Sequence, residues 1–224
     1  MDPKQFELLI ATIDRVKWTE IVSVLVLVLG FAIAVGSLIY ARKQIKADHE
    51  RSRRLLAMEM CSRWSSSSSP ETSSVIRMIE RLTEAQCAAI ANQSSVLIEE
   101  EHKHFLLNIF LLRFPEFGEN IETLKEGNAY RIEGQYVLYL RHIAVRYLNM
   151  LESVLMTWTG GIADQRMIES EFSFLLDEKQ GRTAVEKLRM KIGNETFPAI
   201  NKFMEALRQK AAQRSEDIVR PPTA

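Results

Sequence analysis

The segment Ile21–Tyr40 reads IVSVLVLVLGFAIAVGSLIY and contains no charged side chain. An α-helix rises about 1.5 Å per residue, so a run of this length matches a hydrocarbon layer of roughly 30 Å. A helix also satisfies its own backbone hydrogen bonds, as any chain that crosses lipid must. Trp18 and Tyr40 flank the run, where amphipathic aromatic rings favour the membrane interface. The sequence therefore predicts a single transmembrane helix over residues 21–40.

Two other interpretations of this segment are open. A buried core helix of this length normally carries a polar stripe, and this one offers only two serines and two glycines. A cleaved signal peptide would use Ala32-Ile33-Ala34 as a small-residue cleavage site. However, a signal peptide begins with a short basic segment, whereas the leader here is long and of mixed charge. We therefore expect an uncleaved anchor.

Basic residues are concentrated on the C-terminal side of the apolar run. Lys4, Arg15 and Lys17 precede it, whereas a denser group follows it: Arg42, Lys43, Lys46, Arg51, Arg53 and Arg54. Because Lys and Arg near a span stay on the cytoplasmic side, we expect the N-terminus outside and the C-terminal part in the cytoplasm. The basic group would then lie at the membrane surface, against anionic lipid headgroups. Asp48 and Glu50 interrupt it, which favours a solvated helical stalk over a nucleic-acid site.

The composition of the 224-residue chain fits one helical domain and an appendage. Lys+Arg and Asp+Glu both total 29, so no charge excess points to a nucleic acid or an acidic substrate. Glycine and proline are scarce, at 9 and 6, which leaves room for long helices. Cys61 and Cys87 lack any metal or disulfide spacing, so we expect buried or idle thiols in a reducing compartment.

We therefore expect an all-α fold, with one N-terminal transmembrane helix continuing into a stalk and a cytoplasmic helical bundle. Residues 1–20 form a short amphipathic segment that either lies on the outer interface or extends the span. Residues 21–40 are the transmembrane helix and residues 41–64 the basic helical stalk. Residues 65–214 are the cytoplasmic bundle, and residues 215–224 are a flexible tail.

Local signals predict the helices of the bundle. Ser69 is placed to cap a helix that has Pro70 at its first position. A further helix is expected over residues 94–114, and the longest over residues 131–158, which is apolar on most sides and therefore central. We expect two more near residues 183–192 and 195–214. No strand-like alternation of any length is apparent.

The strongest catalytic candidate is IEEEHKHF, residues 98–105. Glu99 and His102, like Glu101 and His104, have the spacing of the Glu-x-x-His motif of di-iron bundles. Such sites need the motif from two helices, and the other histidines lack a glutamate at that spacing. The phosphate-loop, G-x-S-x-G and H-E-x-x-H motifs are absent as well. We therefore expect a non-enzymatic protein with no catalytic residue, no metal and no cofactor.

Glu152 is the most unusual charged residue of the bundle. It lies in YLNMLESVL, residues 147–155, among apolar neighbours. An unpaired buried charge is very costly, so the carboxylate is either at the rim of the core or buried with a partner. We interpret Glu152 as a structural tether between helices rather than a catalytic group.

Two segments, YARKQIKADHERSRRLLAMEMCSRW from Tyr40 and YLNMLESVLMTWTGGIAD from Tyr147, resemble a widespread bacterial family known only as a domain of unknown function. Its members are typically small single-pass membrane proteins. Their central helix carries an asparagine-aromatic-x-glutamate segment, then a glycine turn and an acidic cap. The positions that match here are Asn149, Glu152, Gly161 and Asp164. The resemblance implies a bacterial inner-membrane protein and an architecture, but no activity.

Three functions are open. The first is a membrane-anchored, non-enzymatic interaction or sensing module whose partners are the lipid bilayer and a cytoplasmic protein. The second is a membrane effector or accessory protein of a phage-defence or toxin system, and the third is an enzyme with an unrecognised site. Gly30 and Ala34, like Ala32 and Gly36, are small residues four apart, so the span could also form a homo-oligomer.

Overall fold

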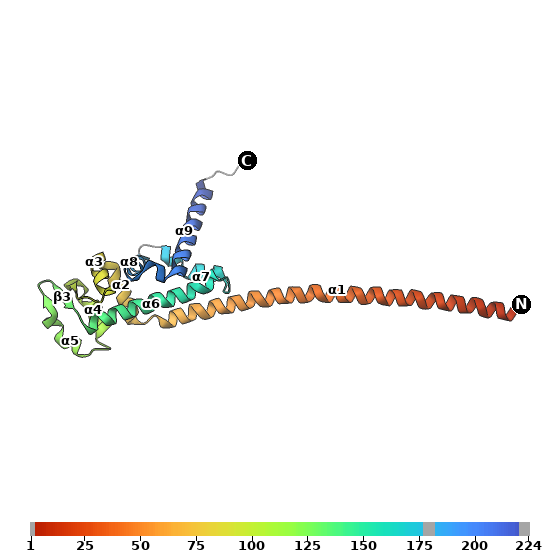
Figure 1. Ribbon diagram of the computed structural model, residues 1–224, viewed down its shortest axis with the longest axis horizontal. Helices are drawn as coiled ribbons and strands as arrows, with labels where there is room; N and C mark the ends of the chain where they lie inside the picture. The colour runs from red at the N-terminus through yellow and green to blue at the C-terminus, as the bar shows by residue number, and fades with distance from the viewer. Residues whose placement is uncertain (1–2, 177–181, 220–224) are drawn as a thin grey trace. The chain divides into compact units, whose positions relative to one another are not determined.

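A computed structural model of the chain describes residues 3–176 and 182–219 (Figure 1). Its contacts divide the chain into two compact units, Met1–Arg51 and Ser52–Ala224. A single helix, α1 (Pro3–Ser67), makes up the described part of the first unit and supplies the first turns of the second. Residues 3–20 are therefore helical and continuous with the predicted span.

Helix α1 is exposed over most of its length. Its segment Glu20–Ser67 is long and apolar enough to cross a membrane, with a mean hydropathy of 2.7 in its most apolar window. No residue of that window is buried, and every residue from Glu20 to Leu55 is exposed. Inside the core of a soluble protein, a helix of this composition would be covered by neighbours. The apolar side chains from Ile21 to Tyr40 are therefore not covered by the part of the chain described.

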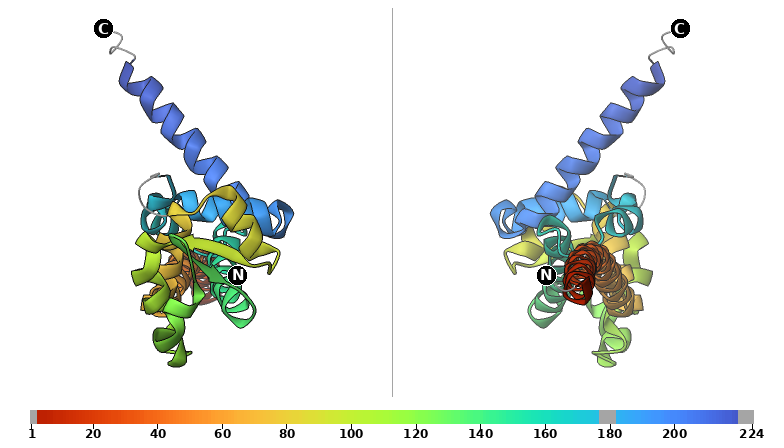
Figure 2. Two further views of the ribbon diagram at one scale, coloured as in Figure 1. Left: turned by 90° about the vertical axis from the view of Figure 1, so that its left-hand side faces the viewer. Right: turned by 90° about the vertical axis from the view of Figure 1, so that its right-hand side faces the viewer.

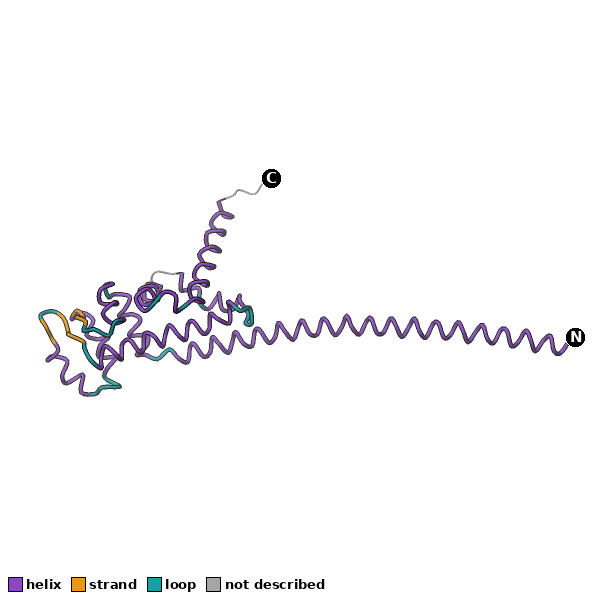
Figure 3. Tube along the Cα trace, viewed as in Figure 1, coloured by secondary structure: helices purple, strands orange, loops and turns teal. Residues whose placement is uncertain are grey.

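The second unit is predominantly helical (Figure 3). Its α-helices after α1 are α2 (Pro70–Arg81), α3 (Glu84–Ala91), α4 (Lys103–Phe110), α5 (Glu116–Asn120), α6 (Gln135–Thr159), α7 (Gln165–Glu171), α8 (Arg182–Ile192) and α9 (Pro198–Val219). Short 3-10 turns are η1 (Glu100–His102), η2 (Ile121–Leu124), η3 (Ser173–Leu176) and η4 (Asn194–Thr196). The prediction of a mostly helical chain is therefore confirmed.

The predicted start of α2 is confirmed in detail. Ser69 has an extended backbone, and its hydroxyl accepts a hydrogen bond from the amide of Thr72 at 3.2 Å. Pro70 occupies the first turn, where its missing N–H costs no intrahelical hydrogen bond. Val75, Met78 and other apolar side chains of the helix then point into the core.

The expectation of a purely α-helical bundle is wrong in one region, which forms a small antiparallel sheet. Strands β1 (Val96–Glu99), β2 (Lys125–Glu126) and β3 (Ala129–Ile132) lie in the order β1-β3-β2. Val96 pairs with Ile132, and Ile98 with Tyr130. The helix expected over residues 94–114 therefore begins only at η1 and α4, and the one expected from residue 131 begins at α6.

The reason for the sheet lies in local sequence. Val96 and Ile98 are β-branched and buried, and they alternate with exposed Leu97 and Glu99 in a strand pattern too short to stand out. Gly127 adopts φ +62° between β2 and β3, a turn conformation that other residues adopt at a cost.

Helix α6 is the centre of the second unit and contacts α2, α3, α8 and α9. Its buried apolar residues are Val137, Leu140, Ile143, Ala144, Leu148, Leu151, Val154, Leu155 and Trp158. Helix α9 covers one side of α6 with Ile200, Phe203 and Leu207. Beyond Leu207, Lys210 still pairs with Glu169 of α7 at 2.6 Å, and the C-terminal part of α9 points away from the other helices (Figure 2).

The last turns of α1 pack into this core. Ala57 is fully buried, and the ring of Trp64 lies 5.0 Å from that of Tyr147 and 5.3 Å from that of Phe172. Burial raises the pKa of Tyr147 far above its usual value. Residues 52–64, assigned to the stalk by sequence, therefore belong to the bundle.

Replacing Trp64 with alanine should destabilise the second unit by about 3 kcal/mol, because a large ring that packs against Tyr147 of α6 and Phe172 at the end of α7 is removed. Met58 lies on the outer side of the same turns and is 56% exposed. Met58→Ala should therefore change stability by less than about 0.5 kcal/mol. Urea unfolding of the full chain in detergent, followed by circular dichroism, measures both. Equal losses for the two variants would contradict this packing.

Candidate functional site

Two residues predicted to lie at the membrane surface, Arg53 and Arg54, instead contact the turn that contains the predicted acidic cap, Asp164. The amide of Asp164 donates to the carbonyl of Arg53 at 3.0 Å. The Arg53 guanidinium donates to the carbonyl of Ala163 at 3.4 Å, and Nε of Arg54 lies 3.6 Å from Oδ2 of Asp164. These contacts join α1 to the turn between α6 and α7, and we refer to them as the α1 junction.

The sequence of the turn explains its position. Gly161 adopts φ +63°, a left-handed conformation that ends α6 and that glycine adopts without strain. The Asp164 side chain then caps α7, accepting from the amides of Arg166 at 3.0 Å and Met167 at 3.3 Å. The matched positions Gly161 and Asp164 thus both shape the turn that receives α1.

The backbone contacts of the α1 junction matter more than its ion pair. The Arg54 side chain is 65% exposed, so solvent screens its attraction to Asp164, and such pairs contribute little to stability. By contrast, the Arg53 carbonyl accepts a hydrogen bond from the amide of Asp164, which would otherwise need another acceptor. The junction therefore fixes where α1 lies on the bundle without depending on surface charge.

Glu152 is buried, with 9% of its surface exposed, and its partner is the N-terminus of α9. Oε1 accepts from the amide of Ala199 at 2.7 Å, and Oε2 from the amide of Ile200 at 2.9 Å. Pro198 begins α9 and has no N–H, so these amides are the first donors of the helix. The positive end of the helix dipole also stabilises the carboxylate. Glu152 thus joins α6 to α9. The sequence allowed a carboxylate at the rim of the core or one buried with a partner, and Glu152 is buried with a partner.

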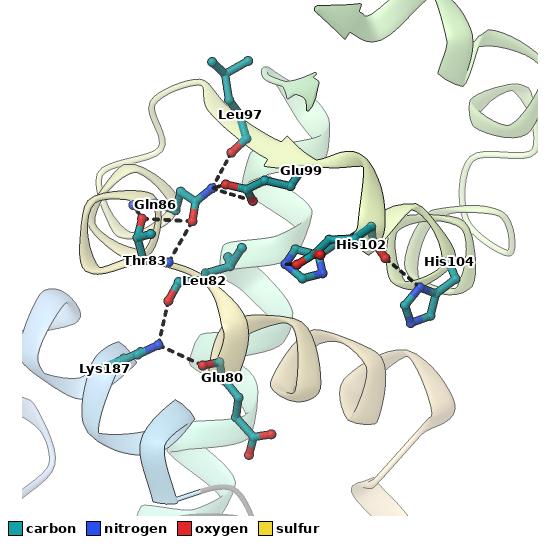
Figure 4. Close-up of polar contacts among 10 residues, drawn as sticks. Glu80, Leu82, Thr83, Gln86, Leu97, Glu99, His102, His104 and Lys187 are labelled. Carbon is teal, nitrogen blue, oxygen red and sulfur yellow. Dashed lines mark hydrogen bonds and ion pairs between the residues drawn. The ribbon is translucent and has the colours of Figure 1, made fainter. Parts of the chain in front are cut away.

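A second set of polar contacts, which sequence reasoning missed, connects α2, α3, α8 and β1 (Figure 4). Nζ of Lys187 donates to the carbonyls of Glu80 at 2.8 Å and Leu82 at 2.6 Å, at the end of α2. Thr83 and Gln86 form a capping box at the start of α3, and the Gln86 amide also donates to the Leu97 carbonyl at 2.7 Å. The T-x-x-Q spacing could have revealed the capping box. The Lys187 contact, between residues more than a hundred positions apart, had no local signal.

The Glu-x-x-His pairs do not come together as a metal centre. His102 is buried with 2% of its surface exposed, and its Nδ1 has no hydrogen-bond partner in the described chain. Glu99 accepts from Gln86, while His104 faces the carbonyl of Glu101 at 3.2 Å (Figure 4). Among residues 3–176 and 182–219, no group of three or more His, Cys, Asp or Glu side chains is placed to hold a metal ion.

The cysteines are free thiols. Cys87 is fully buried, and burial raises its pKa, as it raises that of the half-buried Cys61 near Glu171. Since the thiolate is the reactive form, a raised pKa makes both groups poor nucleophiles.

The remaining predicted residues lie on surfaces. Asn149 is exposed on α6, and its carbonyl accepts from the Ser153 hydroxyl at 2.9 Å. In the first unit, Gly30 and Gly36 have open space around them, with no atom within 4 Å of an added Cβ. The other exposed residues of α1 in these predictions are Ala32, Ala34, Arg42, Lys43, Lys46 and Arg51. The structure therefore does not gather the predicted residues into one site.

Replacing Glu152 with alanine should destabilise the second unit by about 3 kcal/mol, because the amides of Ala199 and Ile200 lose a charged acceptor inside the core. Glu152→Gln keeps one acceptor oxygen and should lose roughly half as much. Chemical unfolding of the full chain in detergent provides the comparison. If the alanine variant is as stable as the native chain, the carboxylate does not hold α9.

The two roles of Asp164 can be separated by substitution. Asp164→Ala removes the cap of α7 and should cost about 1 kcal/mol, whereas Asp164→Asn keeps a good capping side chain and should cost only a few tenths. Hydrogen exchange at the amides of Arg166 and Met167 should accelerate in the alanine variant alone. Acceleration in both variants would show that the charge of Asp164 matters more than its cap.

No protein-family model matches the chain, and no significant match is found among curated proteins or solved structures. The sequence resemblance to a bacterial membrane family therefore remains a prediction.

Proposed function

We propose that the chain is a single-pass membrane protein whose second unit is a non-enzymatic interaction module. The observation that carries this proposal is the contrast between the two units. The second unit encloses a continuous core from α1 to α9, whereas the apolar run of α1 has no cover at all. A membrane is the environment that suits such a helix.

The size of the apolar surface supports the membrane anchor. Large apolar side chains are exposed along almost every turn from Ile21 to Tyr40. Burying one Val, Leu or Ile contributes about 1.5–3 kcal/mol, so leaving the whole run in water would be very unfavourable. Soluble monomers rarely expose contiguous apolar patches of more than a few hundred Å².

The proposed orientation has the N-terminus outside and the second unit in the cytoplasm, in a bacterial inner membrane. Arg42, Lys43 and Lys46 are exposed on α1 directly after the apolar run. Each basic residue near an anionic leaflet contributes about 1 kcal/mol of attraction. The bacterial assignment rests on the sequence resemblance alone.

An interaction role fits the way α1 enters the second unit. Trp64 packs between Tyr147 and Phe172, and Arg53 bonds the turn at Asp164, so the anchor helix forms part of the bundle's core. A partner held by the bundle would thereby be held close to the membrane. The open faces at Gly30 and Gly36 also leave room for a second span, which makes a homo-oligomer part of the proposal.

Topology reporters test the anchor. A fluorescent protein fused after Ala224 should fluoresce, and alkaline phosphatase fused at the same place should be inactive, because the basic residues keep this end in the cytoplasm. The chain should also resist extraction with alkaline carbonate. A control variant with Leu27→Lys and Leu29→Lys should be extracted, since each charge costs about 2.5–3.5 kcal/mol at the centre of a span. An active C-terminal phosphatase would refute the orientation, and extraction of the native chain would refute the anchor.

A further inference from the structure

The solvent-facing side of α6 carries an open groove of about 310 Å³. All of its lining residues belong to α6, at helical spacings of three and four: His142, Val145, Arg146, Asn149, Met150 and Ser153. Arg146 and Met150 also line a small cavity beside Trp64 and Ser67, at the end of α1. The groove is thus the one side of the central helix that lies open along several turns in the described structure.

The charge of the groove has a single sign. Its ionisable lining residues are His142 and Arg146, and neither side chain makes a hydrogen bond or an ion pair within residues 3–176 and 182–219. Elsewhere in the same unit, basic side chains such as Lys103, Lys125 and Lys191 are paired with glutamates. An arginine without a carboxylate in such a surface marks a position where a partner can supply one.

The surroundings of Arg146 extend this basic character. Burial and the Glu71 carboxylate raise the pKa of Tyr139, whereas Arg113 and Arg146 lower it, so both guanidinium groups lie near that ring. Glu71 accepts from the Tyr139 hydroxyl at 3.3 Å and makes no ion pair with either arginine. The carboxylate beside Tyr139 therefore leaves Arg146 available.

We propose that the α6 groove binds an acidic, amphipathic helical segment of a protein partner. This inference rests on the proposed role as an interaction module and identifies the chemistry of the partner. Arg146 and His142 are four residues apart, so two carboxylates with the same spacing on a partner helix can face them. Val145 and Met150 are half-buried and supply apolar contact between these positions. At the far end, the exposed Asn149 side chain can form hydrogen bonds, and the Ser153 hydroxyl, which donates to the Asn149 carbonyl, can still accept one.

A second copy of the chain fits this groove less well. A second copy would bring the same groove residues, which include Arg146 and His142 but no carboxylate. A contact between two such grooves would therefore offer neither arginine an opposite charge, and like charges at an interface oppose association.

The test uses the full chain in nanodiscs of uncharged phosphatidylcholine. The probe is a fluorescent helical peptide of Glu, Leu and Ala with glutamates four residues apart. It should bind the native chain more tightly than a scrambled peptide of equal composition, and more weakly as salt rises. Charge reversal by His142→Glu with Arg146→Glu should weaken binding by at least about tenfold. A peptide with lysine in place of glutamate should prefer this double variant.

Control measurements separate the groove from other causes. Arg77→Glu reverses an exposed charge on α2 and should leave binding unchanged, and thermal unfolding should show that every variant remains folded. Equal binding of the scrambled peptide, or no preference of the lysine peptide for the double variant, would overturn the proposal. Two other results would also overturn it. In one, the native chain forms a dimer that the double variant loses. In the other, the native chain binds phosphatidylserine vesicles but not the peptide, and the double variant no longer binds these vesicles. If the native chain stays in the membrane but binds no peptide, the groove assignment fails and the anchor remains.

Discussion

Burial of apolar side chains around α6 is the constraint on which the second unit depends. Its buried residues face α2, α3, α8 and α9, and each large side chain contributes about 1.5–3 kcal/mol when removed from water. Two polar connections of the unit also start from this helix or its C-terminal turn. Glu152 receives the N-terminus of α9, and the turn at Gly161 brings Asp164 to α1. Within the described residues, the open side of α6 is the groove around Arg146.

Much of this arrangement could be predicted from sequence, because the relevant signals are local. The cap at Ser69, the glycine turn at Gly161 and the cap at Asp164 each use residues a few positions apart. The length of the central helix follows from a long apolar run without proline. The apolar span is the clearest signal of all, since its length and lack of charge are visible directly.

What could not be predicted depends on contacts between distant residues. The run Val96–Glu99 is too short for its sequence pattern to distinguish a strand from a helix. Its pairing with Ala129–Ile132 makes it a strand. The sequence restricts Glu152 to two environments, but its partner Ala199 lies 47 residues away, at the start of a helix that the sequence predicts from residue 195. Arg53 and Arg54 were assigned to a membrane surface from their charge, whereas their contacts with Ala163 and Asp164 required the folded turn.

The bond between Glu152 and α9 has a consequence for the order of folding during synthesis. The ribosome makes Glu152 well before Ala199 and Ile200, the residues whose amides donate hydrogen bonds to its carboxylate. Until α9 emerges, the carboxylate must stay hydrated, because an unpaired buried charge is very costly. The nascent unit therefore keeps one side of α6 open to water while its N-terminal parts assemble. The core around Glu152 can therefore close only after the chain has been translated through α9.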